Sequence, residues 1–463
     1  MELGDEKTPE LMPLTNITKG WKYANVFYGV ADYLAIPIGM LFAAPFLLRH
    51  LGTAQYGVWI LASAAVSSGG LISGGFGDAV IKYVAECRGR RDWQGIVRIV
   101  RSIISINLLL SGILAIALWF IAPYVTRHIV KDDPGLQILC VRALRIGSGL
   151  LLVKSIESVF SSTLRAFETY GSTVQIAICA RTAILASAIA ITQRGGNVVG
   201  IMVVTLLIST SAMLAQALAL RRKVENFSVM PSWHQKTVSD VASFGMFSWL
   251  QALAGVAFSQ ADRFFVGFFM GAPAIAYYGL CVQAAQPIHG LVASAMHVLF
   301  PHLSARYPVA PIGEIRRKVA FAIKVNFTLV CALSLPLIVF GKYVISMWIG
   351  KLVGQLPPLM FPIVVCSFAL LGMNVTAHYS LLAVGQVRLI TYLNLCAGVA
   401  MLLFMAILIP THGLQGAAQA RLIYGPVTCL AYFQVYKIIW RSEPQTFVSQ
   451  PRIQKINAAT ISD

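Results

Sequence analysis

Long apolar segments separated by short polar connections run through the whole chain of 463 residues. A bilayer core is about 30 Å thick, so a helix needs about 20 apolar residues to cross it. At that length the pattern predicts about twelve membrane-spanning helices. The predicted spans are residues 27–48, 58–81, 102–122, 136–160, 173–192, 198–220, 242–267, 275–300, 319–340, 359–383, 388–410 and 414–439. The pattern therefore predicts an all-α polytopic membrane protein.

The polar segments divide the chain into four expected parts. Residues 1–25 and 441–463 are polar and are interpreted as cytoplasmic tails. The longest polar connection, about residues 221–241, separates an N-terminal six-helix lobe (26–225) from a C-terminal one (226–440). The first residues lack a cleavable signal-peptide pattern, so the first apolar helix is expected to act as an uncleaved signal anchor.

Basic residues gather on one side of the predicted membrane. That side holds Lys7, Lys19, Lys22, Lys82, Arg88, Arg90, Arg91, Arg165, Arg221, Arg222, Lys223, Lys236, Arg306, Arg316, Arg317, Lys318, Arg388, Lys437, Arg441, Arg452 and Lys455. The opposite side holds Arg49, Arg127, Lys131, Arg194, Lys342 and Lys351. Cytoplasmic loops carry the excess of Lys and Arg, so both termini are expected in the cytoplasm. This distribution explains the net charge of +18 without nucleic-acid binding.

Composition removes several other classes of protein. Only 12% of the residues are charged, against about 25% in an average soluble domain. The eight Cys are scattered without a C-x-x-C pair, and the His residues do not cluster at metal-ligand spacing. The chain also lacks the G-x-x-x-x-G-K-[ST] phosphate loop. We therefore expect no metal, no cofactor and no catalytic residues, and the protein is not expected to be an enzyme.

The two halves of the chain share short patterns in the same order. "LLRHLGTAQYGVW" (47–59) and "FFVGFFMGAPAIAYYGL" (264–280) both carry a Gly, a short loop and a Tyr-Gly pair. "AFETYGSTVQIAICA" (166–180) aligns with "AVGQVRLITYLNLCA" (383–397), with Cys179 and Cys396 in register. Because each half has an even number of spans, the halves insert with the same orientation, as in transporters built from parallel repeats. Two pseudo-symmetric lobes around a central cavity are expected. The Tyr of each Tyr-Gly pair is expected at headgroup depth.

The segments "PFLLRHLGTAQYGVW" and "QADRFFVGFFMGAPAIAYYGLCVQAAQPIHGL" resemble the polysaccharide-transport family. That family contains the lipid-linked oligosaccharide flippases of O-antigen and exopolysaccharide synthesis. It belongs to the multidrug/oligosaccharidyl-lipid/polysaccharide exporter superfamily. The resemblance covers nearly all of residues 25–440 as topology. It implies a V-shaped fold and export of an anionic polyprenyl-diphosphate-linked oligosaccharide from the cytoplasmic to the outer leaflet by alternating access.

The same resemblance sets expectations about location and partners. A multi-pass protein of the bacterial inner membrane is implied, present as a monomer among membrane lipids. Its substrate is the lipid-linked oligosaccharide, and polysaccharide polymerase and assembly proteins are the partners that such a pathway implies. The glycan and the driving force are left open, because neither leaves a motif in the sequence.

Charged residues within the spans are the candidate binding groups. A charge at the bilayer centre costs about 3 kcal/mol on insertion scales, so it normally faces a wet cavity or a partner. Arginine offers a bidentate, always-charged fork for phosphate oxygens. The expected phosphate-facing group is Arg142, Arg145 and Arg181, with Lys324 and Arg421 as further candidates. The alternatives are snorkelling to the interface for the first two, and a structural Lys154–Glu157 pair at i and i+3.

Four further charges are candidates for gating or coupling: Asp32, Asp78, Asp262 and Arg263. Asp262 and Arg263 are adjacent, so on a helix their side chains point about 100° apart and meet different partners. A gate or inter-helix tie and a fixed salt-bridge network both fit this pair. Asp32 precedes Pro37 and Pro45 in a helix that can bend, and it fits either proton uptake or a hydrated cytoplasmic mouth.

Two rival functions have different requirements. A cation-coupled drug antiporter of the same superfamily needs acidic groups in its cavity, whereas the charges predicted within this membrane region are mostly basic. A membrane-embedded oligosaccharide polymerase needs a sizeable outer loop with catalytic groups, and no predicted outer loop exceeds roughly 20 residues. The sequence favours the flippase.

Overall fold

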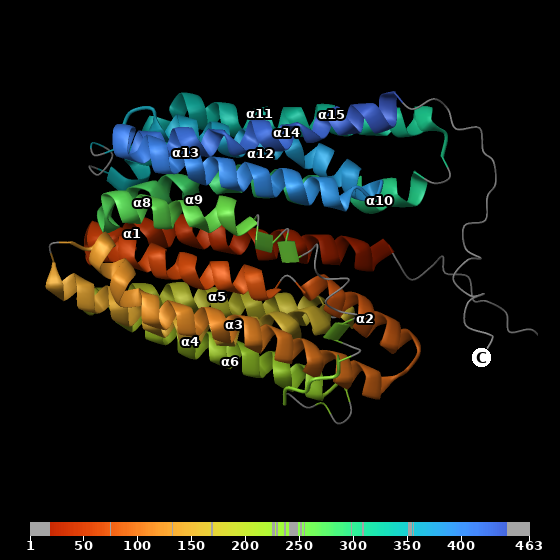
Figure 1. Ribbon diagram of the computed structural model, residues 1–463, viewed down its shortest axis with the longest axis horizontal. Helices are drawn as coiled ribbons and strands as arrows, with labels where there is room; N and C mark the ends of the chain where they lie inside the picture. The colour runs from red at the N-terminus through yellow and green to blue at the C-terminus, as the bar shows by residue number, and fades with distance from the viewer. Residues whose placement is uncertain are drawn as a thin grey trace, which may run out of the picture.

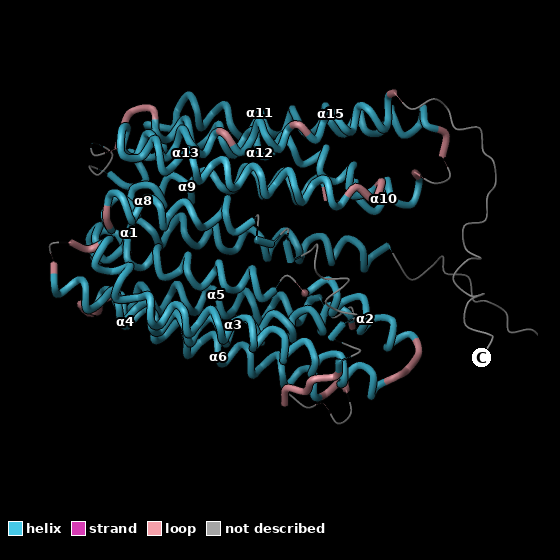
Figure 2. The backbone as a smooth tube through the Cα atoms, in the orientation of Figure 1, coloured by secondary structure: helices cyan, strands magenta, loops and turns pink. Residues whose placement is uncertain are grey.

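The computed structural model describes residues 19–441, apart from residues 75, 132, 168–169, 225–226, 228–229, 236–237, 240–248, 251, 254, 298, 308–309, 351–353 and 355. Helices make up nearly all of this part of the chain, and no strand occurs within it (Figure 2). Seven helices of the described part are long and apolar enough to cross a membrane. The protein is therefore an all-α multi-pass membrane protein, as the hydrophobic pattern predicts.

The helices form two lobes that lie one above the other in Figure 1. The N-terminal lobe contains α1 (Lys19–Gly74), α2 (Gly77–Gly89), α3 (Trp93–Ile129), α4 (Pro134–Ala166), α5 (Tyr170–Gln193) and α6 (Val198–Arg221). The C-terminal lobe contains η1 (Ala257–Ala261), α8 (Asp262–Met270), α9 (Ala272–Met296), α10 (Leu299–Arg306), α11 (Ile312–Ile349), α12 (Met360–Ala383), α13 (Val387–Leu422), α14 (Tyr424–Cys429), α15 (Ala431–Val435) and η3 (Tyr436–Trp440).

Glycines at positive φ separate predicted spans that run together as one long helix. α1 holds the first predicted span and most of the second, whose last residues lie in α2, and it is interrupted at Gly52, where φ is 75°. α13 continues beyond the eleventh span and is interrupted at Gly413, where φ is 58°. Residues with a Cβ rarely adopt this conformation, so glycine lets the chain turn sharply between two antiparallel helices. The start of the seventh predicted span lies outside the described residues.

The lobes share an apolar core at one end and have separate cores at the other. One core contains Leu47 and Tyr56 of α1 together with Ile275 and Tyr278 of α9. A second core lies within the N-terminal lobe, around α2 and the adjoining ends of α3, α4 and α6. A third lies within the C-terminal lobe, around α10, the start of α11 and the end of α15. In Figure 1 the lobes diverge toward the end that carries α2 and α10, which gives the molecule a V shape.

Each Tyr-Gly pair packs against the helix that carries the other pair, where the lobes meet. A Cβ at Gly57 would overlap the carbonyl oxygen of Ala272, and one at Gly279 would lie 2.7 Å from Cδ1 of Ile60. The side chains of Tyr56 and Tyr278 are completely buried, and the hydroxyl of Tyr56 donates to Gln283 across the lobes at 3.4 Å. Both tyrosine side chains are therefore buried in the packed contact between the lobes, and their position relative to the lipid headgroups stays a prediction. The helices that carry them face each other, and the missing glycine side chains allow this close approach.

A hydrogen bond between the lobes follows directly from a proline. Pro45 has no N–H, so the carbonyl of Leu41, four residues earlier in α1, loses its helical donor. The indole Nε1–H of Trp348 in α11 donates to that carbonyl at 2.5 Å. Pro45 therefore leaves a carbonyl oxygen of the N-terminal lobe without its helical donor, and the indole of Trp348 in the C-terminal lobe donates to it instead.

Candidate functional site

A polar cavity of about 310 Å³ lies inside the N-terminal lobe. We name it the N-lobe cavity. It is lined by Val66, Ser67, Gly70, Lys154, Glu157, Ser158, Ser161, Arg165, Thr173, Val174, Ala177, Arg181 and Gln216. These residues come from α1, α4, α5 and α6. The α4 members recur at a helical spacing of three or four, so they form one face of that helix.

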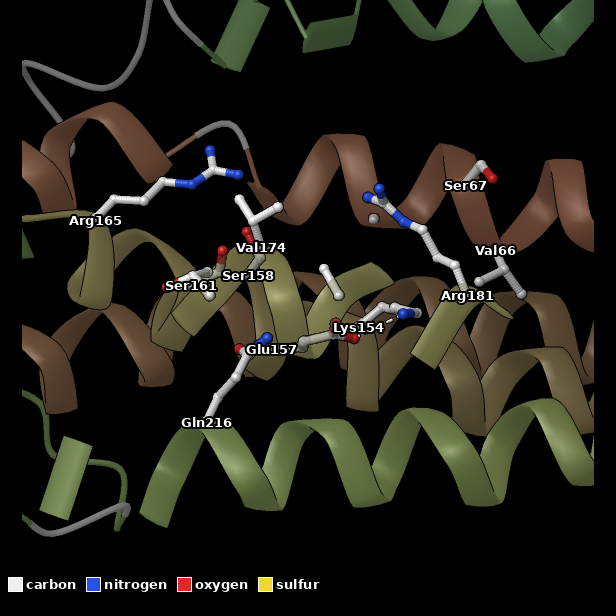
Figure 3. A pocket seen from close by; sticks show the side chains of 13 residues that line it. Val66, Ser67, Lys154, Glu157, Ser158, Ser161, Arg165, Val174, Arg181 and Gln216 are labelled. Carbon is white, nitrogen blue, oxygen red and sulfur yellow. Dashed lines mark hydrogen bonds and ion pairs between the residues drawn. The ribbon is translucent and has the colours of Figure 1, made fainter. Parts of the chain in front are cut away.

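Basic groups dominate the N-lobe cavity. Lys154 donates to Glu157 at 2.7 Å, so the single carboxylate among the lining residues is already paired. Arg165 and Arg181 add two more positive charges. Figure 3 shows both guanidinium groups extending away from α6, whereas Gln216 points from α6 toward Glu157. With three cations and one anion, the cavity offers positive potential and several donors to an anion.

A second cavity, of about 390 Å³, lies inside the C-terminal lobe. We name it the C-lobe cavity. Its walls come from η1, α9, α12, α13 and α14, and they include Gln286, His289, Asn374, His378, Asn394 and Arg421. Aromatic rings of Phe258, Phe368, Tyr379 and Tyr424 complete the wall. This cavity therefore combines amides, imidazoles and aromatic faces.

A buried ion pair includes Arg421, one of the wall residues of the C-lobe cavity. Asp262 of α8 and Arg421 of α13 are 0% and 1% exposed, and Nη1 of Arg421 donates to Oδ2 of Asp262. The hydroxyl of Tyr278 donates to the same oxygen at 2.8 Å. The guanidinium of Arg421 also lies over the rings of Phe258 and Phe368, at 4.0 and 4.6 Å from their centroids. The positive charge of Arg421 is thus neutralised locally, and η1, a π-helical turn, leads directly into Asp262.

The two adjacent charges meet different partners, as their helical spacing predicts. Oδ1 of Asp262 accepts the backbone N–H of Arg263 at 2.8 Å, while Oδ2 faces α9 and α13. The guanidinium of Arg263 donates instead to Oε1 of Gln260. Asp262 therefore ties α8, α9 and α13 together within one lobe.

The structure does not bring the three expected arginines together. Arg142 and Arg145 line an apolar groove between α3, α4 and α6, with Trp119 and Phe120, and Arg145 lies 4.9 Å from the Trp119 ring centroid. Arg181 lines the N-lobe cavity instead. Nine residues separate Arg145 from Lys154, which corresponds to about half a turn beyond two full turns of helix. The expected grouping is therefore corrected: Arg145 lies on the face of α4 opposite the cavity.

This placement predicts unequal effects of neighbouring arginines. We expect Arg145→Ala to leave binding of inorganic pyrophosphate, used as an anionic probe, within about twofold of wild type, because the side chain faces the groove and not the cavity. Arg165→Ala on the same helix should weaken binding several-fold. Titration of the purified full-length protein with pyrophosphate measures both. A larger loss for Arg145→Ala than for Arg165→Ala would contradict the assignment.

The remaining candidates have different positions. Lys324 is exposed on α11 and lines neither cavity. The side chains of Asp32 and Asp78 lie outside the described residues, so their coupling role stays a prediction. Arg165 was placed among the cytoplasmic loop residues by the charge pattern, and the structure brings it into the N-lobe cavity. Its spacing of eleven residues from Lys154, three helical turns, was the signal available in the sequence.

Comparison with known proteins identifies the family. Residues 24–306 match the family model described as polysaccharide biosynthesis protein. No curated protein sequence shows significant similarity to this chain.

Solved membrane transporters share the fold. The lipid II flippase MurJ in an inward closed conformation has a TM-score of 0.72 at 14% identity, with coverage of 89% of this chain and 87% of that chain. An inward-facing multidrug resistance MATE family transporter has a TM-score of 0.70 at 17% identity, with coverage of 88% and 97%. A MOP superfamily transporter from Pyrococcus furiosus has a TM-score of 0.55 at 17% identity, with coverage of 88% and 95%. Because the family match extends over more than half of the chain, the protein belongs to the polysaccharide biosynthesis protein family and has the fold of MOP superfamily transporters.

Proposed function

We propose that the protein is a flippase that moves an anionic polyprenyl-diphosphate-linked oligosaccharide from the cytoplasmic to the outer leaflet by alternating access. The observation that carries the proposal is the N-lobe cavity, in which Lys154, Arg165 and Arg181 outnumber the single, paired carboxylate of Glu157. A diphosphate headgroup needs several cationic donors, and arginine forks suit its oxygens. The family match to polysaccharide biosynthesis supports this class of substrate.

The shape of the molecule supports alternating access. The lobes are joined by one shared core and diverge at the end that carries α2 and α10. Since the basic loops gather at that end, we assign it to the cytoplasm, with both termini there. In this state a headgroup enters from the cytoplasmic leaflet while its polyprenyl tail stays in the bilayer. Closing that end and parting the Tyr-Gly contact would expose the headgroup to the other side.

The drug antiporter is the rival to be excluded. A cationic drug needs acidic partners, and the two carboxylates described at the cavities, Glu157 and Asp262, are each paired with a cation. This arrangement favours an anionic substrate. The proposed chemistry is movement without bond breaking, so no catalytic residue is assigned.

The test measures in which leaflet the lipid-linked oligosaccharide lies in cells with and without the protein. Deletion of the gene should trap lipid-linked oligosaccharide in the cytoplasmic leaflet, and wild-type protein should restore it to the outer leaflet. Arg181→Ala should restore it at least tenfold less well, because loss of charge-assisted hydrogen bonds costs about 1.5–3 kcal/mol each. Cys179→Ala, an exposed position on the same helix, is the control. Normal export after deletion, together with loss of cationic-dye efflux, would overturn the flippase proposal.

A further inference from the structure

The two cavities occupy equivalent places in the repeated halves. Ser67 lies ten residues after Gly57, and His289 lies ten residues after Gly279 of the second Tyr-Gly pair. Ser67 lines the N-lobe cavity and His289 lines the C-lobe cavity. The duplication has therefore produced one cavity in each lobe at the same helix position.

A second equivalence comes from the aligned cysteines. Ala177 lies two residues before Cys179, and Asn394 lies two residues before Cys396. Ala177 lines the N-lobe cavity and Asn394 lines the C-lobe cavity. At both equivalent positions the C-terminal half carries the larger and more polar side chain: the imidazole of His289 in place of the hydroxyl of Ser67, and the amide of Asn394 in place of the methyl of Ala177. The two cavities have thus diverged in chemistry while they kept their place in the repeat.

The C-lobe cavity contains polar atoms that lack a partner. Asn374 is 6% exposed, and its Oδ1 accepts no hydrogen bond in the described part of the chain. Arg421 is 1% exposed, and its Nε is similarly unpartnered although Nη1 pairs with Asp262. A buried polar atom without a partner costs about 1–3 kcal/mol, so a ligand that supplies the missing partner recovers that free energy. Both residues line the C-lobe cavity.

Charge and shape define the ligand chemistry. Arg421, the cation among the described wall residues, is neutralised by Asp262, so the cavity suits a neutral ligand rather than a diphosphate. Amide and imidazole groups both donate and accept, as sugar hydroxyls do. The rings of Phe258, Tyr379 and Tyr424 offer apolar faces for the C–H faces of a pyranose. A volume of about 390 Å³ lies at the small end of ligand sites and suits one or two sugar residues.

We infer that the C-lobe cavity recognises a sugar residue of the transported lipid-linked oligosaccharide and sets glycan specificity, while the N-lobe cavity holds the diphosphate. This inference rests on the proposed function. The substrate headgroup then spans both lobes, with its charged part on one side and its neutral part on the other. A site that hydrogen-bonds substrate hydroxyl groups discriminates strongly against a ligand that lacks them.

The test uses two probes and purified full-length protein in lipid nanodiscs. The probes are bare polyprenyl diphosphate and the lipid-linked oligosaccharide fraction extracted from the organism's membranes. The key variant is the double substitution His289→Ser with Asn394→Ala, because it places in the C-lobe cavity polar and small side chains related to those of the N-lobe cavity. Cys396→Ala, an exposed position on the same helix as Asn394, is the matched control. Binding is measured by native mass spectrometry.

The wild type and Cys396→Ala should bind the oligosaccharide lipid at least tenfold more tightly than the bare lipid. The double variant should lose this preference and keep its affinity for bare polyprenyl diphosphate within twofold. Asn394→Gln, which keeps the amide, should retain part of the preference. A wild type without preference overturns the inference. So does a double variant that weakens both probes equally, or that changes neither.

Arg181→Ala separates this inference from the proposed function. A loss of affinity for both probes supports the diphosphate site. If Arg181→Ala changes neither probe while the double variant still removes the preference for the oligosaccharide lipid, the diphosphate assignment fails and the sugar site stands.

Discussion

Substituting Arg421 by Met should strongly destabilise the folded protein. The substitution leaves the Asp262 carboxylate buried at 0% exposure without its counter-ion, while Tyr278 and the backbone N–H of Arg263 still donate to it. Breaking a buried ion pair by removal of one partner costs about 3–5 kcal/mol. The unfolding temperature of the detergent-solubilised protein measures the effect.

The double variant Asp262→Leu with Arg421→Met provides the decisive comparison. It removes both charges, so its unfolding temperature should lie above that of either single variant. Lys154→Met is the matched control, because the side chains of the Lys154–Glu157 pair are 33% and 13% exposed and solvent screens such a pair more than the fully buried one, so its loss should cost less. A double variant less stable than both singles would show that the pair is not the source of the effect.

The second large effect is expected where the lobes touch. Gly57→Val should abolish transport, because its side chain would overlap the carbonyl oxygen of Ala272, a backbone atom that cannot rotate away. Gly279→Ala is the control, because its Cβ would meet the end of the Ile60 side chain, which can shift. Spin labels at Lys131 and His412, two exposed positions of opposite lobes near this end, report the distance between the lobes.

We expect the label distance to increase for Gly57→Val and to stay close to wild type for Gly279→Ala. The native cysteines are replaced before labelling. A Gly57→Val protein that transports normally and keeps the wild-type distance would show that this contact is not required for closure.

Helix positions were predictable because burial in a bilayer acts on each segment separately. The third to sixth predicted spans fall within α3, α4, α5 and α6. The two Tyr-Gly pairs could also be recognised in the sequence, but the helices against which they pack could not be predicted from it. The hydrogen bond from Tyr56 to Gln283 depends on a helix more than 200 residues away, and nothing in the local sequence contains that information.

The charged residues also separate what local spacing predicts from what depends on tertiary packing. The half-turn between Arg145 and Lys154 could have been read from the spacing, because helical periodicity is a local property. Which face of α4 meets the cavity could not, since that depends on how α3, α5 and α6 pack around it. Likewise the sequence made Arg421 a candidate for substrate binding and Asp262 a candidate for gating or coupling. The structure pairs the two with each other, and this pair joins α8 to α13.

By itself, the sequence determined that this chain is a helical membrane protein with short patterns repeated in its two halves, an excess of cations and a resemblance to polysaccharide flippases. Those properties follow from composition, local periodicity and repeated motifs. Only the tertiary structure decided which charges share a cavity, that each lobe has its own, and that the Tyr-Gly pairs close one end of the molecule. These outcomes depend on contacts between helices far apart in the chain, where packing selects one face of each helix.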